Sequence, residues 1–312
     1  MKKRLAKISV ALIGAPTDVG AGVPGAREGP SALRACGVSR ELEAAGCDVL
    51  DMGDCSGPPN PEGEPRDGYR NLAEVAAWCS SVKAACSQAL ELGRVPVLLG
   101  GDHCLAIGSL GAVAESCERA GRRLRVLWLD AHADFNTART TPSGNMHGMP
   151  LSALCEAAPD LVAAVARPGA LSAADLRLIG VRSVDEGEAR AIGRLGVWVL
   201  GVGALRERGA EEAAGEALAG WREGDHLHVS FDVDFLDPED APGVGTRVEG
   251  GPTLAEARAL MDAIGARARV GSLDIVELNP SLDVDGKTAL RAVELAVRLF
   301  RPRGSDAPAG AS

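Results

Sequence analysis

Carboxylate and imidazole side chains cluster directly behind three apolar segments of the chain. Gly100-Gly101-Asp102-His103 follows the first, Asp130-Ala131-His132-Ala133-Asp134 the second, and Asp232-Val233-Asp234 the third. Side chains alternate between the two faces of an extended chain. The three polar residues of the second segment should therefore point the same way, and so should the two aspartates of the third. With His103 of the first segment, these residues could bring four carboxylates and two imidazoles to one site.

Divalent cations account for such a cluster better than protein groups alone. Four carboxylates brought together without a counter-charge repel one another and titrate upward. Oxygen and nitrogen ligands without thiolate suit Mn²⁺ or a similar ion better than a structural zinc site. Six ligands are too many for one ion that keeps open positions, but they fit two ions that share carboxylates. Such pairs lie roughly 3.5–4 Å apart and bring the pKa of bound water near 7, so the sequence predicts a two-metal hydrolase.

Each segment taken alone has a plainer interpretation. Residues 130–134 could be a solvated strand edge, residues 232–234 a turn or helix cap, and the glycine pair 100–101 an ordinary turn. All three occur together, each at the end of an apolar segment, and this combination favours the metal site.

Eight short apolar segments have the pattern of buried strands, and helical patterns lie between most of them. They are Ile8–Ile13, Cys47–Met52, Val95–Leu99, Leu124–Leu129, Leu176–Ile179, Val197–Leu200, His226–Phe231 and Gly271–Val276. Strands that alternate with helices predict an α/β fold of three layers, α/β/α, with a mainly parallel eight-stranded sheet. In open sheets of this kind ligands bind outside the carboxyl ends of the strands, where the three polar segments lie.

Two apolar stripes at helical spacing predict helices that pack on this sheet. They consist of Leu72, Val75, Cys79, Val82, Cys86 and Leu90, and of Leu290, Val293, Val297 and Phe300. No linker divides residues 1–300, so we expect a single domain. Residues 301–312, rich in Pro, Gly, Ala and Ser, are expected to form a disordered tail.

Charge, hydropathy and cysteine usage narrow the class of protein. A formal net charge of −10 argues against nucleic acid as a partner, because phosphates require a basic surface. No apolar run reaches membrane-spanning length, and Lys7 interrupts the N-terminal stretch that imitates a signal peptide. None of the eight cysteines forms a C-x-x-C pair, and several fall on predicted apolar helix faces. This pattern favours reduced thiols in a cytoplasmic protein.

The same segments resemble the signatures of the ureohydrolases, the family of arginases and agmatinases. The resemblance includes Leu236-Asp237-Pro238 and spans the chain from Glu28-Gly29-Pro30 to Glu277-Leu278-Asn279-Pro280. Asn136 together with Ser143-Gly144-Asn145-Met146-His147-Gly148 is similar to the substrate loop of arginases rather than that of agmatinases. The resemblance implies hydrolysis of L-arginine to L-ornithine and urea by a hydroxide that bridges two Mn²⁺ ions in each subunit.

The resemblance also implies which residues hold the metals. One ion would be bound by His103, Asp130, Asp134 and Asp232. The other would be bound by Asp130, His132, Asp232 and Asp234. Asp130 and Asp232 would then bridge the two ions.

Three residues match the catalytic positions of the family. Glu277 would orient the guanidinium by charge-assisted hydrogen bonds, since resonance makes its carbon a poor electrophile. Asp134 would carry the hydroxide proton to the departing amine. His147 titrates in a useful range and would relay protons to bulk water. Without the metal segments, Glu277 would be an ordinary polar residue at a strand end and His147 an ordinary loop histidine.

The substrate loop matches the groups of an amino acid. Asn136, Thr141 and Ser143 would receive the α-carboxylate, while Asn145 and Asp185 would receive the α-amino group. The resemblance places Glu188 near the α-amino end and Thr246 near the guanidinium end. Agmatine has no α-carboxylate, so polar matching of this kind argues against it. Asp185 and Glu188 also suit the first turn of a helix, whose dipole favours negative charge.

Four positions depart from the family pattern and are expected to touch the rim of the cleft. Ala138 and Arg247 stand where prolines are common, Ser183 where an aspartate is usual, and Phe235 where animal members usually have a small residue. They leave the affinity and the pH profile open, but not the reaction type. The family implies a homotrimer or homohexamer, and nothing in the sequence decides between them.

Three alternatives stay open. The first is a hydrolase of agmatine or another guanidino compound, which relative rates on arginine and agmatine would separate. The second is a metal-dependent deacylase on a related fold, typically with a single zinc, which metal stoichiometry would separate. The third is a metal-binding homologue without activity. The presence of all six ligands together with Glu277 and His147 weighs against it.

Overall fold

A computed structural model describes residues 7–301 of the chain. One sheet of eight strands, in the order β2-β1-β3-β8-β7-β4-β5-β6, forms its middle layer. Every pairing within it is parallel. The strands are β1 (Ser9–Gly14), β2 (Asp48–Asp54), β3 (Val95–Leu99), β4 (Leu124–Leu129), β5 (Leu176–Ile179), β6 (Trp198–Leu200), β7 (His226–Asp232) and β8 (Val270–Val276).

The predicted strands are confirmed, with bounds that differ by at most two residues. The largest difference is at β2, which was expected to end at Met52 and ends at Asp54. β2 lies at the edge of the sheet and is largely exposed, but its backbone still pairs with β1 as far as Asp54. Apolar patterning does not mark the end of an edge strand, because only backbone hydrogen bonds hold it there.

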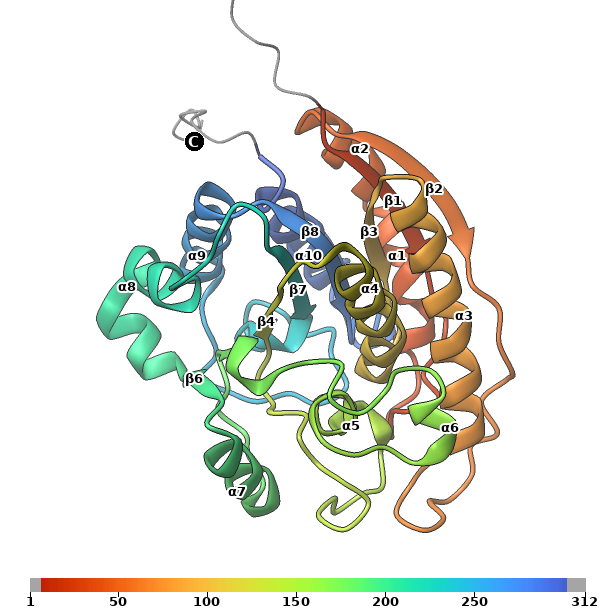
Figure 1. Ribbon diagram of the computed structural model, residues 1–312. Helices are drawn as coiled ribbons and strands as arrows, with labels where there is room; N and C mark the ends of the chain where they lie inside the picture. The colour runs from red at the N-terminus through yellow and green to blue at the C-terminus, as the bar shows by residue number, and fades with distance from the viewer. Residues whose placement is uncertain (1–6, 302–312) are drawn as a thin grey trace, which may run out of the picture.

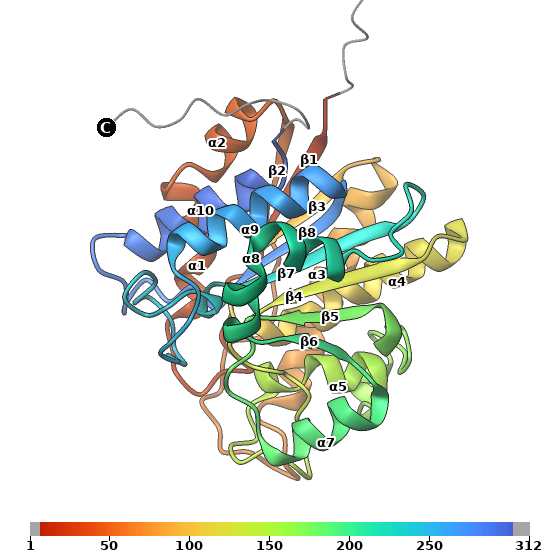
Figure 2. The same cartoon turned by 90° about the vertical axis from the view of Figure 1, so that its left-hand side faces the viewer.

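Helices cover both faces of the sheet, as Figures 1 and 2 show. Side chains of β1 alternate between the two apolar layers: Val10 and Leu12 face one, Ala11 and Ile13 the other. The layer of Val10 includes α1 (Gly29–Ala35), α2 (Val38–Ala44), α8 (Val202–Ala217), α9 (Leu254–Arg267) and α10 (Lys287–Arg298). The layer of Ala11 includes α3 (Leu72–Glu91), α4 (Ala106–Ala120), α5 (Pro150–Cys155), α6 (Asp160–Ala163) and α7 (Glu186–Leu195). The predicted three-layer α/β/α fold is therefore confirmed.

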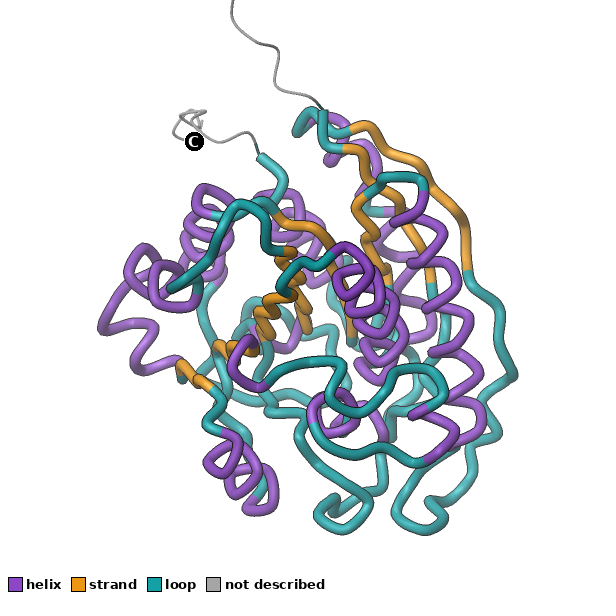
Figure 3. The backbone as a smooth tube through the Cα atoms, in the orientation of Figure 1, coloured by secondary structure: helices purple, strands orange, loops and turns teal. Residues whose placement is uncertain are grey.

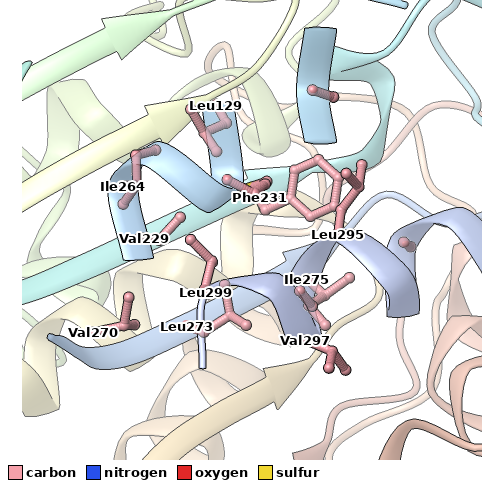
Figure 4. Packing of buried hydrophobic residues seen from close by; sticks show 14 of the residues in the cluster. Leu129, Val229, Phe231, Ile264, Val270, Leu273, Ile275, Leu295, Val297 and Leu299 are labelled. Atoms are coloured by element: carbon pink, nitrogen blue, oxygen red, sulfur yellow. The ribbon is translucent and has the colours of Figure 1, made fainter. Parts of the chain in front are cut away.

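Large aliphatic and aromatic side chains fill the space between the sheet and its helices. Figure 4 shows Phe231 of β7 and Ile275 of β8 beside Leu295 of α10, all fully buried. Burying a side chain of this size stabilises the fold by roughly 1.5–3 kcal/mol. This packing stabilises the positions of the central strands, and therefore of the strand ends at which the loops begin.

The stripe predicted for the last helix is wrong at Leu290, which is 55 % exposed. The other three residues of that stripe, Val293, Val297 and Phe300, are buried as predicted. The buried face of α10 also includes Leu295 and the small residues Ala289, Ala292 and Ala296. The stripe therefore identified the buried face but included one exposed residue at the start of the helix. The first stripe is confirmed in α3, where Val75, Cys79, Val82 and Cys86 are buried.

The order of strands brings distant parts of the chain together. β3 and β4 are consecutive in sequence, but β8 and β7 lie between them in the sheet. The strand order changes direction at this point, which in open α/β sheets creates a crevice at the carboxyl ends of the strands. Loops that follow the strands gather on one side of the sheet, the lower side in Figure 3.

Other expectations concern cysteines, membranes and the tail. All eight cysteines are free thiols. Within residues 7–301, no helix combines the length and apolarity required to cross a membrane. The tail expected to be disordered, residues 301–312, lies outside the described residues except for Arg301.

Candidate active site

The first group of predicted metal ligands surrounds the imidazole of His103. This residue opens a short 3₁₀ helix, which residues 100–102 separate from the end of β3, and its side chain is 1 % exposed. Its Nδ1 atom lies 3.1 Å from Asp130 Oδ2, 3.0 Å from Asp134 Oδ2 and 3.2 Å from Asp232 Oδ2. The three carboxylates come from the ends of β4 and β7, so the sheet brings all four residues together.

The second group surrounds His132. Its Nδ1 atom lies 3.0 Å from Asp234 Oδ2 and 3.5 Å from Asp130 Oδ1. Asp130 therefore contributes one oxygen to each group, as a shared ligand must. All four aspartates of the two groups are buried.

The two groups are electrostatically unfavourable on their own. Burial, together with the charge of Asp130, raises the pKa of Asp134 to about 7. Burial and the neighbouring aspartates also raise the pKa of Asp232 well above its usual range. His103 Nδ1 and Asp134 Oδ2 are buried, and neither has a hydrogen-bond partner among residues 7–301. Buried nitrogen and oxygen atoms left without partners at such a convergence fit an N/O-binding divalent cation.

Two residues outside the predicted set hold these ligands in place. Trp128 stacks on the His103 ring at 4.0 Å between centroids and donates from Nε1 to Asp130 Oδ2 at 2.9 Å. Ser230 Oγ lies 2.8 Å from His103 Nε2, which leaves Nδ1 facing the carboxylates. Sequence reasoning missed both, although alternation along a strand gave a signal. Each lies two residues before an aspartate of the cluster, on the same face of its strand.

Glu277 and His147 form a pair beside the two groups. Glu277 follows β8, and its Oε1 accepts the backbone N–H of His103 at 2.8 Å. The same oxygen lies 2.9 Å from His147 Nδ1. Burial would lower the pKa of His147, but the charge and hydrogen bond of Glu277 outweigh it and raise this pKa to about 9. Glu277 and Asp134 are both buried residues with left-handed backbone, at φ values of 63° and 53°.

A cleft of about 320 Å³ opens above these residues. It is lined by all the predicted site residues except Asp130 and Asp234, which lie buried beneath it. The lining residues are His103, His132, Asp134, Asn136, Thr141, Pro142, Ser143, Asn145, His147, Gly148, Ser183, Asp185, Glu188, Asp232, Thr246 and Glu277. The substrate loop and the metal groups thus share one cavity.

Asp185 and Glu188 serve the helix and the cleft together. They form a capping box at the start of α7, in which Glu188 Oε2 accepts the backbone N–H of Asp185 at 2.9 Å. Asp185 Oδ2 also accepts from Asn136 Nδ2 at 2.8 Å, and Glu188 Oε1 accepts the backbone N–H of Phe135 at 2.9 Å. The interpretation as residues at the start of a helix is confirmed, and this helix terminus contacts the substrate loop. Their contact with an α-amino group stays a prediction.

Phe235 does not touch the rim of the cleft, so that expectation is wrong. Its side chain is fully buried, packing edge-on against Phe231 and over Gly180. A side chain at residue 180 would collide with the Phe235 ring, so Gly180 makes room for it. Ser183 does line the cleft, as expected.

Fold and site together define a hydrolase of the α/β class with a candidate metal centre at the switch point of its sheet. The chain belongs to the arginase family: the family's model matches residues 8–301. It is an enzyme of this family.

Relatives align with nearly the whole chain in sequence and in structure. An arginase of Agrobacterium fabrum is 39 % identical over 307 residues, covering 95 % of this chain and 91 % of that protein. An arginase of Bacillus caldovelox is 41 % identical over 297 residues, covering 93 % and 97 %. The solved native structure of the Bacillus caldovelox arginase matches with a TM-score of 0.88 and 39 % identity, over 96 % of this chain and 100 % of the other.

Proposed function

We propose that this enzyme hydrolyses L-arginine to L-ornithine and urea at a centre of two Mn²⁺ ions. The proposal is carried by the single cleft in which buried carboxylates and imidazoles lie beneath a rim of Asn, Thr, Ser and Asp side chains. Its similarity to the arginases of Agrobacterium fabrum and Bacillus caldovelox supports the same activity.

The six ligands at the base of the cleft would divide between the two ions. His103, Asp130, Asp134 and Asp232 would hold one. Asp130, His132, Asp232 and Asp234 would hold the other. When bound, the ions would lower the pKa of water towards 7 and stabilise the negative charge that develops on attack.

Glu277 would bind the guanidinium of the substrate through charge-assisted hydrogen bonds. The backbone N–H of His103 fixes one oxygen of this carboxylate, so its orientation relative to the metal ligands is set. Its contact with His147 would give way to the substrate, one cation replacing another. A buried carboxylate thereby keeps a counter-charge throughout, which avoids the cost of an unpaired buried charge.

Hydrolysis forms a C–O bond at the guanidinium carbon and breaks the bond from that carbon to Nε of arginine, which becomes the side-chain amino nitrogen of ornithine. The departing nitrogen needs a proton, and water supplies it. Asp134 would take this proton and pass it to the departing amine. His147, released from Glu277, would exchange protons with bulk water at the open side of the cleft.

The rim would read the amino-acid end of the substrate. Asn136, Thr141 and Ser143 would hydrogen-bond the α-carboxylate, and Asp185 with Glu188 would attract the α-ammonium group. Thr246 donates to Asp234 Oδ2 at 3.2 Å and would border the guanidinium end. An analogue without the carboxylate leaves these donors unpaired, which is the strongest form of discrimination available to a polar site.

Urea release tests the proposal. The enzyme is incubated warm with Mn²⁺ and assayed on L-arginine and on agmatine, beside a metal-stripped sample. Manganese-dependent urea from L-arginine, with little from agmatine, is the expected result. Release from agmatine at an equal rate would overturn the substrate assignment, and activity unaffected by metal removal would overturn the metal centre.

The assembly and cellular setting are a further part of the proposal. A homotrimer or homohexamer is expected for a member of this family, and sedimentation equilibrium of the Mn²⁺-loaded enzyme measures the mass. The eight free thiols support a reducing compartment such as the cytoplasm.

A further inference from the structure

A segment between β2 and α3 packs against the substrate loop. We call this segment, residues 56–71, the strap; the substrate loop comprises residues 136–148. Arg70 donates its backbone N–H to the carbonyl of Gly144 at 2.8 Å. A Cβ on Gly144 would lie 2.6 Å from Pro65 Cβ, so a glycine is needed for this close approach. Both segments lie at the lower end of the molecule in Figure 1.

The side chain of Arg70 extends this contact to Asn145 of the substrate loop. Its Nε atom donates to Asn145 Oδ1 at 2.7 Å, and its Nη1 donates to the carbonyl of Gly63 at 2.8 Å. A guanidinium has only donors, so the amide atom that faces Arg70 must be the oxygen. The amide nitrogen of Asn145 is turned away from Arg70, towards Gly22. Asn145 itself lines the cleft.

This orientation decides which ligand group Asn145 can serve. An amide whose oxygen is occupied offers N–H donors, which suit a carboxylate and repel an ammonium group. We propose that Arg70 is a positioning residue: it makes Asn145 a donor towards the α-carboxylate, so the strap contributes to selection of amino-acid substrates. The inference rests on the proposed function, and it revises the expectation that Asn145 receives the α-amino group.

The strap is anchored well enough to hold Arg70 in place. Arg70 directly precedes Asn71, the N-cap residue of α3, and Asn71 Nδ2 donates to the carbonyl of Val19 at 2.9 Å. Farther along the strap, the Pro58 carbonyl accepts from Trp78 Nε1 of α3 at 2.8 Å. A positioning contact is most effective when a rigid element supports it, and here α3 supplies that support.

The experiment compares R70M with R66M in the Mn²⁺-loaded enzyme. Arg66 lies in the same strap, is exposed, and pairs through its backbone with Tyr69, so R66M is the matched control. We expect R70M to raise KM for L-arginine roughly tenfold with kcat within about twofold, the effect of losing one hydrogen bond to a charged group. R66M should change neither constant, and R70K should fall between R70M and the wild type.

Product binding separates recognition of the carboxylate from general damage to the cleft. L-Ornithine and 1,4-diaminobutane differ by the α-carboxylate, so R70M should weaken ornithine roughly tenfold in calorimetry and leave the diamine unchanged. In a background of N145A, R70M should add nothing further. Equal weakening of both compounds, additive losses in the double variant, or unchanged ornithine binding would each overturn the proposal.

The test still decides if R70M does not fold or if the wild type shows no activity on L-arginine. If R70M does not fold, as judged by its melting temperature, R70K gives the decision by the same ornithine and diamine measurements. If the wild type releases no urea from L-arginine, the proposed function fails, whereas calorimetry still decides whether Arg70 controls recognition of a carboxylate. The two failures are therefore distinguishable.

Discussion

The floor and the rim of the cleft are built in different ways. The floor, made of the six predicted metal ligands, sits directly on the ends of central strands and is almost wholly buried. The rim, made of the substrate loop and the strap, consists of irregular segments held by hydrogen bonds between loops. We infer a division of labour in which the sheet fixes the reaction and the loops fix the substrate. Changes in the floor should therefore affect metals and kcat, whereas changes in the rim should affect KM.

The largest effect is expected from Asp232→Ala in the floor. Asp232 would serve both ions, and its loss leaves His103 without one of three nearby carboxylates. Turnover should fall at least about a thousandfold, because several kcal/mol of stabilisation depend on the metals. Mass spectrometry of bound manganese and a urea assay measure the two losses. Two retained ions with full activity would show that the floor is wrongly assigned.

Glu277→Gln, beside the floor, should show whether the charge of Glu277 is needed for substrate binding or for metal binding. The amide keeps the shape of the side chain but removes the charge that would pair with the guanidinium of the substrate. We expect kcat/KM to fall roughly a hundredfold while manganese content stays at the wild-type level. A fall in manganese content would instead mean that Glu277 acts through the backbone of His103, which it contacts.

Asn136→Ala tests the rim. Asn136 lines the cleft and donates a hydrogen bond to Asp185. Its substitution would remove a donor for the α-carboxylate of the substrate and would leave the Asp185 carboxylate without this hydrogen bond. We expect KM for L-arginine to rise roughly tenfold, with both ions retained and kcat nearly unchanged. Steady-state kinetics and metal analysis of one preparation measure both. Loss of an ion in this variant would break the distinction between floor and rim.

The smallest effect is expected at the opposite end of the sheet, at His226. Burial, with His228 and Arg122 nearby, lowers the pKa of His226 to about 3, whereas in the unfolded chain it is about 6.5. The folded protein keeps this ring neutral while the unfolded chain binds a proton, so stability falls as pH drops from about 6.5 towards 3. Between pH 7.5 and 5.5 this costs about 1 kcal/mol.

His226→Asn should remove that part of the pH dependence and leave KM unchanged. Urea unfolding of the metal-free enzyme at the two pH values measures the difference between variant and wild type. Equal losses of stability in both proteins would mean that His226 is protonated in the fold.

The floor was predictable because two regular rules determine it. Apolar segments marked the strands. Alternation along an extended chain placed Asp130, His132 and Asp134 on the same side. The same rule places Trp128 and Ser230, each two residues before an aspartate of the floor, on the same face of their strands. The prediction for Leu290 was wrong because this apolar residue lies on the exposed side of α10, while Val293 and Val297 of the same stripe are buried.

The rim was predictable only through family resemblance, and only in part. Arg70 and Asn145 are 75 residues apart, and no periodic pattern connects them. Their contact depends on how two irregular loops pack, with glycines permitting close approach. Interactions of this kind depend on tertiary structure, so no local pattern in the sequence predicts them.

The left-handed backbone at Asp134 and Glu277 has a consequence for how the protein can evolve. Non-glycine residues in this conformation cost roughly 1–3 kcal/mol each, which the surrounding fold must offset. Glycine or asparagine at either position would adopt the same backbone more comfortably. A laboratory lineage selected for heat resistance alone would therefore drift away from these two carboxylates, and only continued selection for turnover would keep them.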